Sequence, residues 1–201
     1  MAQHETYEAA RLWTAAQRGE TETVKAMMQR ICAAPEADFE PRFSRVFLPA
    51  LKVAIVNHHA PTVDAIAAHI TWPSTEWYTL MDTAAQFGNV HAVRRFAFDA
   101  PNFQLQHALL VATLHSHARV VRALLAFRPT CVSGDALVSA LLTRNRVVLG
   151  LLLYACTSED DLRTCLCGVT RDSHYSKSSF FTAALYKWRK RRERRDSMRV
   201  S

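Results

Sequence analysis

Glycine is scarce in this sequence, with 5 residues among 201. A loop that cradles phosphate groups needs several glycines so that backbone amides can approach the ligand closely, and no such loop is present. The sequence also lacks the GxSxG and HExxH patterns of serine hydrolases and zinc peptidases. These absences weigh against an enzyme. We predict a protein that binds without catalysis and without a cofactor or metal.

Cysteines are few and scattered, and long apolar runs are missing. The five cysteines are an odd number and suit a reducing compartment better than a disulfide framework. No run of uncharged apolar residues approaches the length of a membrane span. Glu5 and Glu8 stand where a leader peptide would carry basic residues. We therefore expect an intracellular protein, cytoplasmic or nuclear, with no transmembrane segment.

The net charge of +7 is concentrated at the C-terminus. Residues 186–201 carry eight basic and two acidic residues, so residues 1–185 contribute only +1. We expect the body of the protein to have no strong electrostatic attraction for phosphate. The segment is a candidate contact for nucleic acid or another acidic surface, or else it is a solvated tail. Its basic residues are Lys187, Arg189, Lys190, Arg191, Arg192, Arg194 and Arg195.

Five segments of the chain align without internal gaps, which indicates an internal repeat. They begin at Leu12, Leu51, Met81, Leu109 and Leu137. If the first residue is position 0, position 3 is always alanine and positions 12 and 15 are always apolar. Apolar residues at positions 0, 3 and 4, and again at 11, 12, 15 and 16, form two helical stripes separated by a polar turn. Each segment therefore predicts a pair of helices.

The segments AAQRGETETVKAMM and AAQFGNVHAVRRFA resemble the helical half of ankyrin repeats, L-x-x-A-A-x-x-G-H-x-x-V-V-x-x-L-L. The resemblance covers about residues 8–155 and implies an all-α solenoid of about five ankyrin-like helix pairs. Two features depart from that family. His58, Ser116 and Arg144 replace the turn glycine at position 7, and the 28-residue spacing of the later segments leaves little room for β-hairpin fingers. Another helical solenoid, such as the pentatricopeptide type, is the alternative.

We expect three parts in the chain. Residues 1–170 form the ankyrin-like repeat domain, 171–178 a linker, and 179–201 a C-terminal helix with the basic tail. Phe181, Leu185 and Trp188 share one face of this helix. Two interpretations are open: the apolar face caps the last helix pair, or the helix is a detachable element that docks on an acidic partner.

In ankyrin-like units, positions 5 and 6 at the end of the first helix line the concave surface. The resemblance thus gives ten candidate partner-binding residues. They are Gln17, Arg18, Val56, Asn57, Gln86, Phe87, Leu114, His115, Leu142 and Thr143. The bulky apolar members either belong to the core or form a patch that a partner covers. We predict a protein-interaction module, an adaptor or assembly subunit, with a patch centred on Phe87 and Leu114. The alternative is a ribonucleoprotein subunit that holds RNA through its basic tail.

Two groups of residues have the right types to bind a metal, and we assign neither to a metal site. The spacing of the first group fits no paired C-x2-C framework. It consists of Cys156, Cys165, Cys167 and His174. The second group lies in the turns of the predicted repeats, where the ankyrin pattern itself has a histidine. It consists of His58, His59, His115 and His117.

Overall fold

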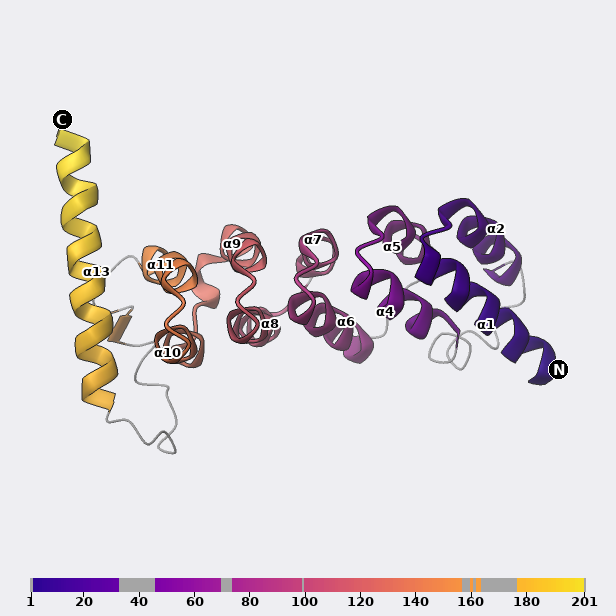
Figure 1. Cartoon of the computed structure of the whole chain (residues 1–201), viewed down its shortest axis with the longest axis horizontal. Coiled ribbons are helices and arrows are strands. Elements are labelled where there is room, and N and C mark those ends of the chain that lie inside the picture. The colour runs from indigo at the N-terminus through magenta and orange to yellow at the C-terminus, as the bar shows by residue number, and fades with distance from the viewer. Residues whose placement is uncertain are drawn as a thin grey trace. The chain divides into compact units, whose positions relative to one another are not determined.

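The structure is a computed structural model that describes residues 2–32, 46–69, 74–98, 100–156, 160, 162–163 and 177–200. These residues are helical or lie in turns, and they include no strand (Figure 1). The chain divides into two compact units, residues 1–96 and 97–201. The predicted all-α fold class is thereby confirmed. The predicted repeat domain, linker and tail boundaries stay predictions.

Each aligned segment is a pair of helices joined by a tight turn. The pairs of the first unit are α1 (Ala2–Arg18) with α2 (Thr21–Cys32), α4 (Leu48–Val56) with α5 (Ala60–Ala67), and α6 (Ser74–Gln86) with α7 (Val90–Ala97). Those of the second unit are α8 (Asn102–Leu114) with α9 (Ala118–Phe127), and α10 (Gly134–Leu142) with α11 (Arg146–Ala155). A short 3-10 helix, η3 (Pro129–Cys131), and a long final helix, α13 (Lys177–Val200), complete the second unit.

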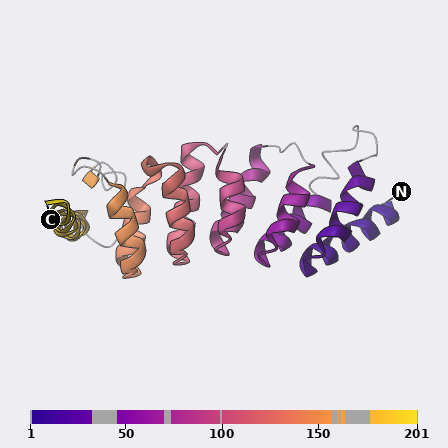
Figure 2. The same ribbon diagram turned by 90° about the horizontal axis from the view of Figure 1, so that it is seen from above.

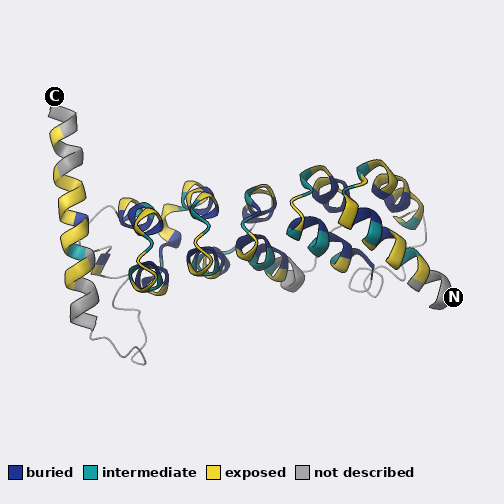
Figure 3. Cartoon of the chain, viewed as in Figure 1, coloured by how far each residue is buried: buried dark blue, intermediate teal, exposed yellow. Residues whose placement is uncertain are grey.

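Neighbouring pairs pack first helix against first helix and second against second. In the first unit α4 contacts both α1 and α6, and α2 contacts α5. In the second unit α8 contacts α10, and α9 contacts α11, so that each unit contains two rows of helices (Figure 2). The apolar stripe of each helix faces the neighbouring helices and is buried, and the face turned away from them meets water (Figure 3).

The alanine column lies where first helices pack together. All five alanines are buried, with at most 4% of their surface exposed: Ala15, Ala54, Ala84, Ala112 and Ala140. Position 0 is also fully buried in every pair, and so is position 12 apart from 3% at Leu149. The small alanine side chain lets neighbouring backbones approach closely, while larger residues at positions 12 and 15 fill the core beside the second helices. The repeat register deduced from the sequence is therefore confirmed.

The turns share one backbone conformation, although only two of them contain glycine. Position 7 has a positive φ in all five, +70° at Gly19, +73° at Gly88, and +52° to +63° at the three other residues. The next amide, at position 8, donates to the carbonyl of the column alanine over 2.9–3.2 Å. This bond is typical of the left-handed helix ending in which the chain reverses out of its last turn. The non-glycine turns thus keep the repeat geometry and carry the steric cost of a left-handed residue.

Position 8 then begins the second helix. Its carbonyl accepts the amide of position 12 over 2.9–3.0 Å in every pair. In two pairs the residue is asparagine, whose side chain also caps the helix: Asn89 accepts from Ala92 N at 3.0 Å, and Asn145 from Val148 N at 3.1 Å. One residue therefore ends one helix and starts the next, which explains why the two helices of a pair are joined so tightly.

The final helix α13 crosses α10 and α11 and contacts both (Figures 1 and 2). Trp188 anchors it, with 7% of its surface exposed and its indole Nε1–H donating to the Cys156 carbonyl at 2.9 Å. Cys156 is the C-terminal cap of α11, so this bond satisfies a carbonyl that α11 itself leaves open. The predicted helix near the C-terminus is confirmed. Of its predicted apolar face, Leu185 is half-buried, and the side chain of Phe181 lies outside the described residues.

Candidate functional site

The ten residues predicted from positions 5 and 6 lie where each first helix ends. They directly precede the left-handed turn residue, and all are exposed except Val56, which is half-buried. Six of them belong to the first unit, from α1, α4 and α6 and the residues just after these helices. The other four belong to the second unit, at the ends of α8 and α10. The predicted set is thus divided between two surfaces, one on each unit.

Large apolar side chains are exposed in this band. The exposed fraction is 41% for Phe87, 53% for Leu114 and 49% for Leu142. The interpretation in which they form core is therefore wrong for these three residues, because the tight turn leaves positions 5 and 6 outside the contact between neighbouring pairs. Exposed apolar area costs free energy in water, and its recurrence at position 5 or 6 of three helix pairs favours surfaces that a partner covers.

Side chains at position 8 connect consecutive turns of the first unit. The His59 ring donates from Nε2 to the Gln17 carbonyl at 3.0 Å, which reaches back to the end of α1. Asn89 donates from Nδ2 to the Ile55 carbonyl at 2.8 Å, back to the end of α4. Gly19 is needed at its position for a second reason besides its φ, since a Cβ there would lie 2.7 Å from the His59 ring. The three turns therefore form one continuous, hydrogen-bonded edge.

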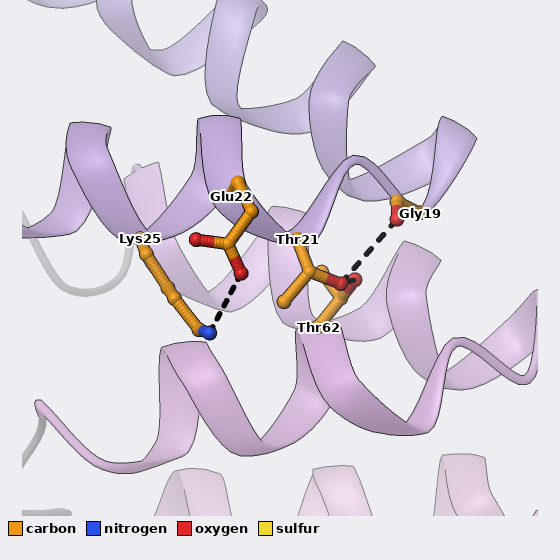
Figure 4. A network of polar contacts seen from close by, with 5 residues as sticks. All are labelled: Gly19, Thr21, Glu22, Lys25 and Thr62. Carbon is orange, nitrogen blue, oxygen red and sulfur yellow. Dashed lines mark hydrogen bonds and ion pairs between the residues drawn. The ribbon is translucent and has the colours of Figure 1, made fainter.

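Polar contacts beside this edge tie the second helices together as well. The hydroxyl groups of Thr21 and Thr62 lie 3.1 Å apart, between α2 and α5, and Thr21 also donates to the Gly19 carbonyl at 3.4 Å (Figure 4). Lys25 pairs with Glu22 of the same helix at 2.8 Å. These contacts support the turn edge from the side of α2 and give a partner a fixed backbone to bind.

The turn edge of the second unit is built from different side chains. The rings of His115 and His117 stack with centroids 6.2 Å apart, beside exposed Leu114. Among the described residues no group of three or more metal-ligating side chains comes together. Three members of the cysteine-rich candidate lie outside those residues: Cys165, Cys167 and His174.

The basic residues predicted as a tail belong to α13, an ordered helix of the second unit. Those with described side chains are exposed: Lys187, Arg189, Lys190, Arg191 and Arg192. The side chains of Arg194 and Arg195 lie outside the described set. Two cations stack on aromatic rings one turn earlier, Lys190 over Tyr186 at 5.8 Å and Arg192 over Trp188 at 5.2 Å. Much of the positive charge is thus fixed along a helix.

Further basic residues, which the sequence analysis did not select, lie on the helix pairs of the second unit. Residues 102–155 contain five arginines and one acidic residue. Arg119 and Arg122 are exposed on α9, and Arg144 and Arg146 are exposed at the turn into α11. The signal was present in the sequence. Averaging the charge over residues 1–185 concealed it, because acidic residues elsewhere cancel these arginines.

Comparisons with known proteins give no family for this chain. No protein-family model, no curated protein and no solved structure matches it. In the part of the chain that the structure describes, no helix has the length and apolar character that crossing a bilayer requires.

Proposed function

We propose that the protein is a non-catalytic interaction module, an adaptor or assembly subunit, that binds another protein along the ends of its first helices. The observation that carries the proposal is the exposure of Phe87, Leu114 and Leu142 at positions 5 or 6 of their helix pairs. Stacked helix pairs present such positions at regular intervals, which suits an extended peptide or a protein face. The ankyrin-like sequence pattern supports the same function.

The rigidity of the turn edge supports this function too. Position 8 fixes the backbone on both sides of each turn, and in the first unit it also holds the preceding turn. A surface that is already ordered loses little conformational entropy when a partner binds. Apolar side chains on a fixed backbone are therefore suited to act as binding anchors.

The test compares two double variants of the full chain as bait. Phe87→Ala with Leu114→Ala removes apolar area from the turn edge of each unit. Phe103→Ala with Tyr154→Ala is the matched control, because those side chains are 60% and 68% exposed at the other ends of the helices. For a partner captured by the wild-type protein and then purified, we expect the first variant to bind at least about 10-fold more weakly and the control to bind normally. Equal affinity of both variants, with unchanged circular dichroism, would exclude these surfaces.

A second candidate function is a nucleic-acid-associated subunit. The observation that favours it is the charge of α13. This helix has nine basic and two acidic residues, so its net charge of +7 is as large as that of the whole chain. Binding through these charges should weaken steeply as salt rises, whereas binding through Phe87 and Leu114 should not. A salt titration therefore separates the two functions.

A further inference from the structure

Positive charge is distributed very unequally between the two units. The first unit has nine basic and ten acidic residues, and the second has sixteen basic and eight acidic residues. The difference is not confined to α13, because the helix pairs α8 to α11 contribute a net charge of +4 over residues 102–155. The second unit is therefore basic on its repeats as well as on its final helix.

The repeat register places Arg119 and Arg122 of α9 along the row of second helices, and Arg146 lies at position 9, the start of α11. In the first unit, position 10 of one second helix meets position 13 of the preceding one, as His91 and Asp64 show with Nε2 and Oδ1 2.9 Å apart. In the second unit, positions 10 and 13 of α9 are Arg119 and Arg122. Position 13 of α11 is Gly150, and a Cβ there would collide with the guanidinium group of Arg191 from α13. Arg191 thus occupies the place that the next helix pair would fill.

At positions 10 and 13 the second helices of the first unit carry both acidic and basic residues, with Arg94 exposed, whereas those of the second unit carry two arginines and no acidic residue. In the first unit Glu22 pairs with Lys25, and Asp64 pairs with His91. Within the described part of the second unit, five exposed arginines have no carboxylate partner. They are Arg119, Arg122, Arg144, Arg146 and Arg191. Helices α9 and α11 are in contact, and α11 contacts α13, so the exposed arginines of the repeats adjoin the helix that carries Lys187 and Lys190. Exposed residues lie along all three helices (Figure 3).

The chemistry of this surface favours phosphate groups in series. Arginine dominates it, and the planar guanidinium group binds phosphate through two parallel hydrogen bonds. Exposed aromatic rings lie on the same helices, Tyr154 on α11 and Tyr186 on α13, with 68% and 64% of their surface accessible. Unpaired bases stack on such rings without sequence preference. An acidic protein would have to match the shape of three crossing helices, whereas a flexible strand adapts to it.

We propose that α9, α11 and α13 form a binding track for single-stranded nucleic acid, with the repeat arginines Arg119, Arg122 and Arg146 as part of the site. The inference rests on the second candidate function and deepens it, since it moves the site from a tail onto folded helices. Phosphates contact these arginines, and bases stack on the exposed tyrosines. Protein binding at the turn edge uses other residues.

The experiment measures fluorescence anisotropy of a labelled, unstructured 20-nucleotide RNA with the full chain from about 50 to 300 mM salt. The repeat variant carries Arg119→Gln, Arg122→Gln and Arg146→Gln. The helix variant carries Lys187→Gln, Arg189→Gln and Lys190→Gln, which spares the docked Trp188 and Arg191. The matched control carries Arg11→Gln, Arg18→Gln and Arg30→Gln, three exposed arginines of α1 and α2 in the first unit. DNA of the same sequence and poly-glutamate complete the set of ligands.

We expect the repeat variant to lose affinity and salt dependence together. Each phosphate contact to a single strand contributes about 0.7 to the slope of log K against log salt. Loss of three contacts should lower the slope by about 2 and the affinity by roughly 100-fold at 0.1 M salt, and the control should bind normally. Similar affinity for RNA and DNA identifies the phosphate backbone as the shared ligand, and preference for RNA adds contacts to the 2′-hydroxyl.

Three results would overturn the proposal in distinguishable ways. If the repeat variant binds like the wild-type chain and the helix variant does not bind, the site is α13 alone, and only the second candidate function survives. If the wild-type chain binds neither nucleic acid, that function fails as well. If poly-glutamate binds as tightly as RNA and displaces it, the surface recognises acidic chains in general and the proposed track is wrong.

Discussion

Replacement of Trp188 by alanine tests whether α13 is a structural cap. The indole is 93% buried, and such a truncation typically costs about 3–5 kcal/mol through lost burial and the cavity left behind. Trp188→Phe is the finer perturbation, because it keeps one aromatic ring in place and removes the N–H that donates to the Cys156 carbonyl together with a few buried ring atoms. We expect this variant to lose about 1 kcal/mol. Urea unfolding followed by circular dichroism measures both values.

Labelling of the cysteine thiols tests the docking of α13 at the place where the helix packs. With Cys32, Cys165 and Cys167 replaced by serine, the remaining cysteines, Cys131 and Cys156, are both buried. Cys156 lies directly beneath α13, whereas Cys131 lies in η3 and is the internal control. If α13 must move before Cys156 reacts, loss of 3 kcal/mol of docking free energy should accelerate its labelling about 100-fold and leave Cys131 unchanged. An unchanged rate at Cys156 together with an unchanged urea midpoint for Trp188→Ala would refute the docked position of the helix.

Three further predictions concern the turns and the core. Arg144→Gly should stabilise the protein by about 0.5–1 kcal/mol in thermal unfolding, because its φ is +52°, whereas Thr143→Gly, at φ −72°, should destabilise it by a similar amount. Asn89→Ala should cost about 2–4 kcal/mol and Asn145→Ala about 1 kcal/mol in chemical denaturation, because Asn89 also satisfies a buried carbonyl of the preceding pair. Burial raises the pKa of the Cys131 thiol to about 11, above its value in the unfolded chain. Folding therefore favours the protonated thiol, so the stability gained from burying it is complete below about pH 8.5 and is lost as the pH rises to 11. The same pH dependence of stability in Cys131→Ala would contradict this.

Much of the fold could be predicted because small and large residues recur at fixed positions of the repeat. Alanine at position 3 and larger residues at positions 12 and 15 follow from how closely the helices pack, and the structure buries them as expected. The turn was harder to predict. His58, Ser116 and Arg144 looked like departures from the pattern, since glycine is the usual left-handed residue. The backbone bond from position 8 to the column alanine forms with any residue at position 7, so these turns pay a modest strain and keep the geometry.

The candidate site was only partly predictable, for two physical reasons. Position in a repeat predicts exposure, so the surface location of Phe87 and Leu114 could be read from the register. Pairing of charges cannot be read in the same way, because it depends on which side chains meet across neighbouring helices. Asp64 meets His91 only because α5 and the start of α7 come within reach of each other's side chains. Arg191 covers Gly150 only because α13 returns across α11, a contact between residues 41 positions apart that no local pattern specifies.

Two side chains at position 8 of the first unit, His59 and Asn89, point in the same direction along the chain. Each binds a carbonyl of the pair that precedes it in the sequence, so both donors find their acceptors in a segment that leaves the ribosome earlier. A newly synthesised pair can dock on a neighbour that has already folded and does not have to wait for the one that follows. In the first unit the order of synthesis is therefore also an order in which interfaces can close, and unpaired apolar faces stay exposed for the shortest time.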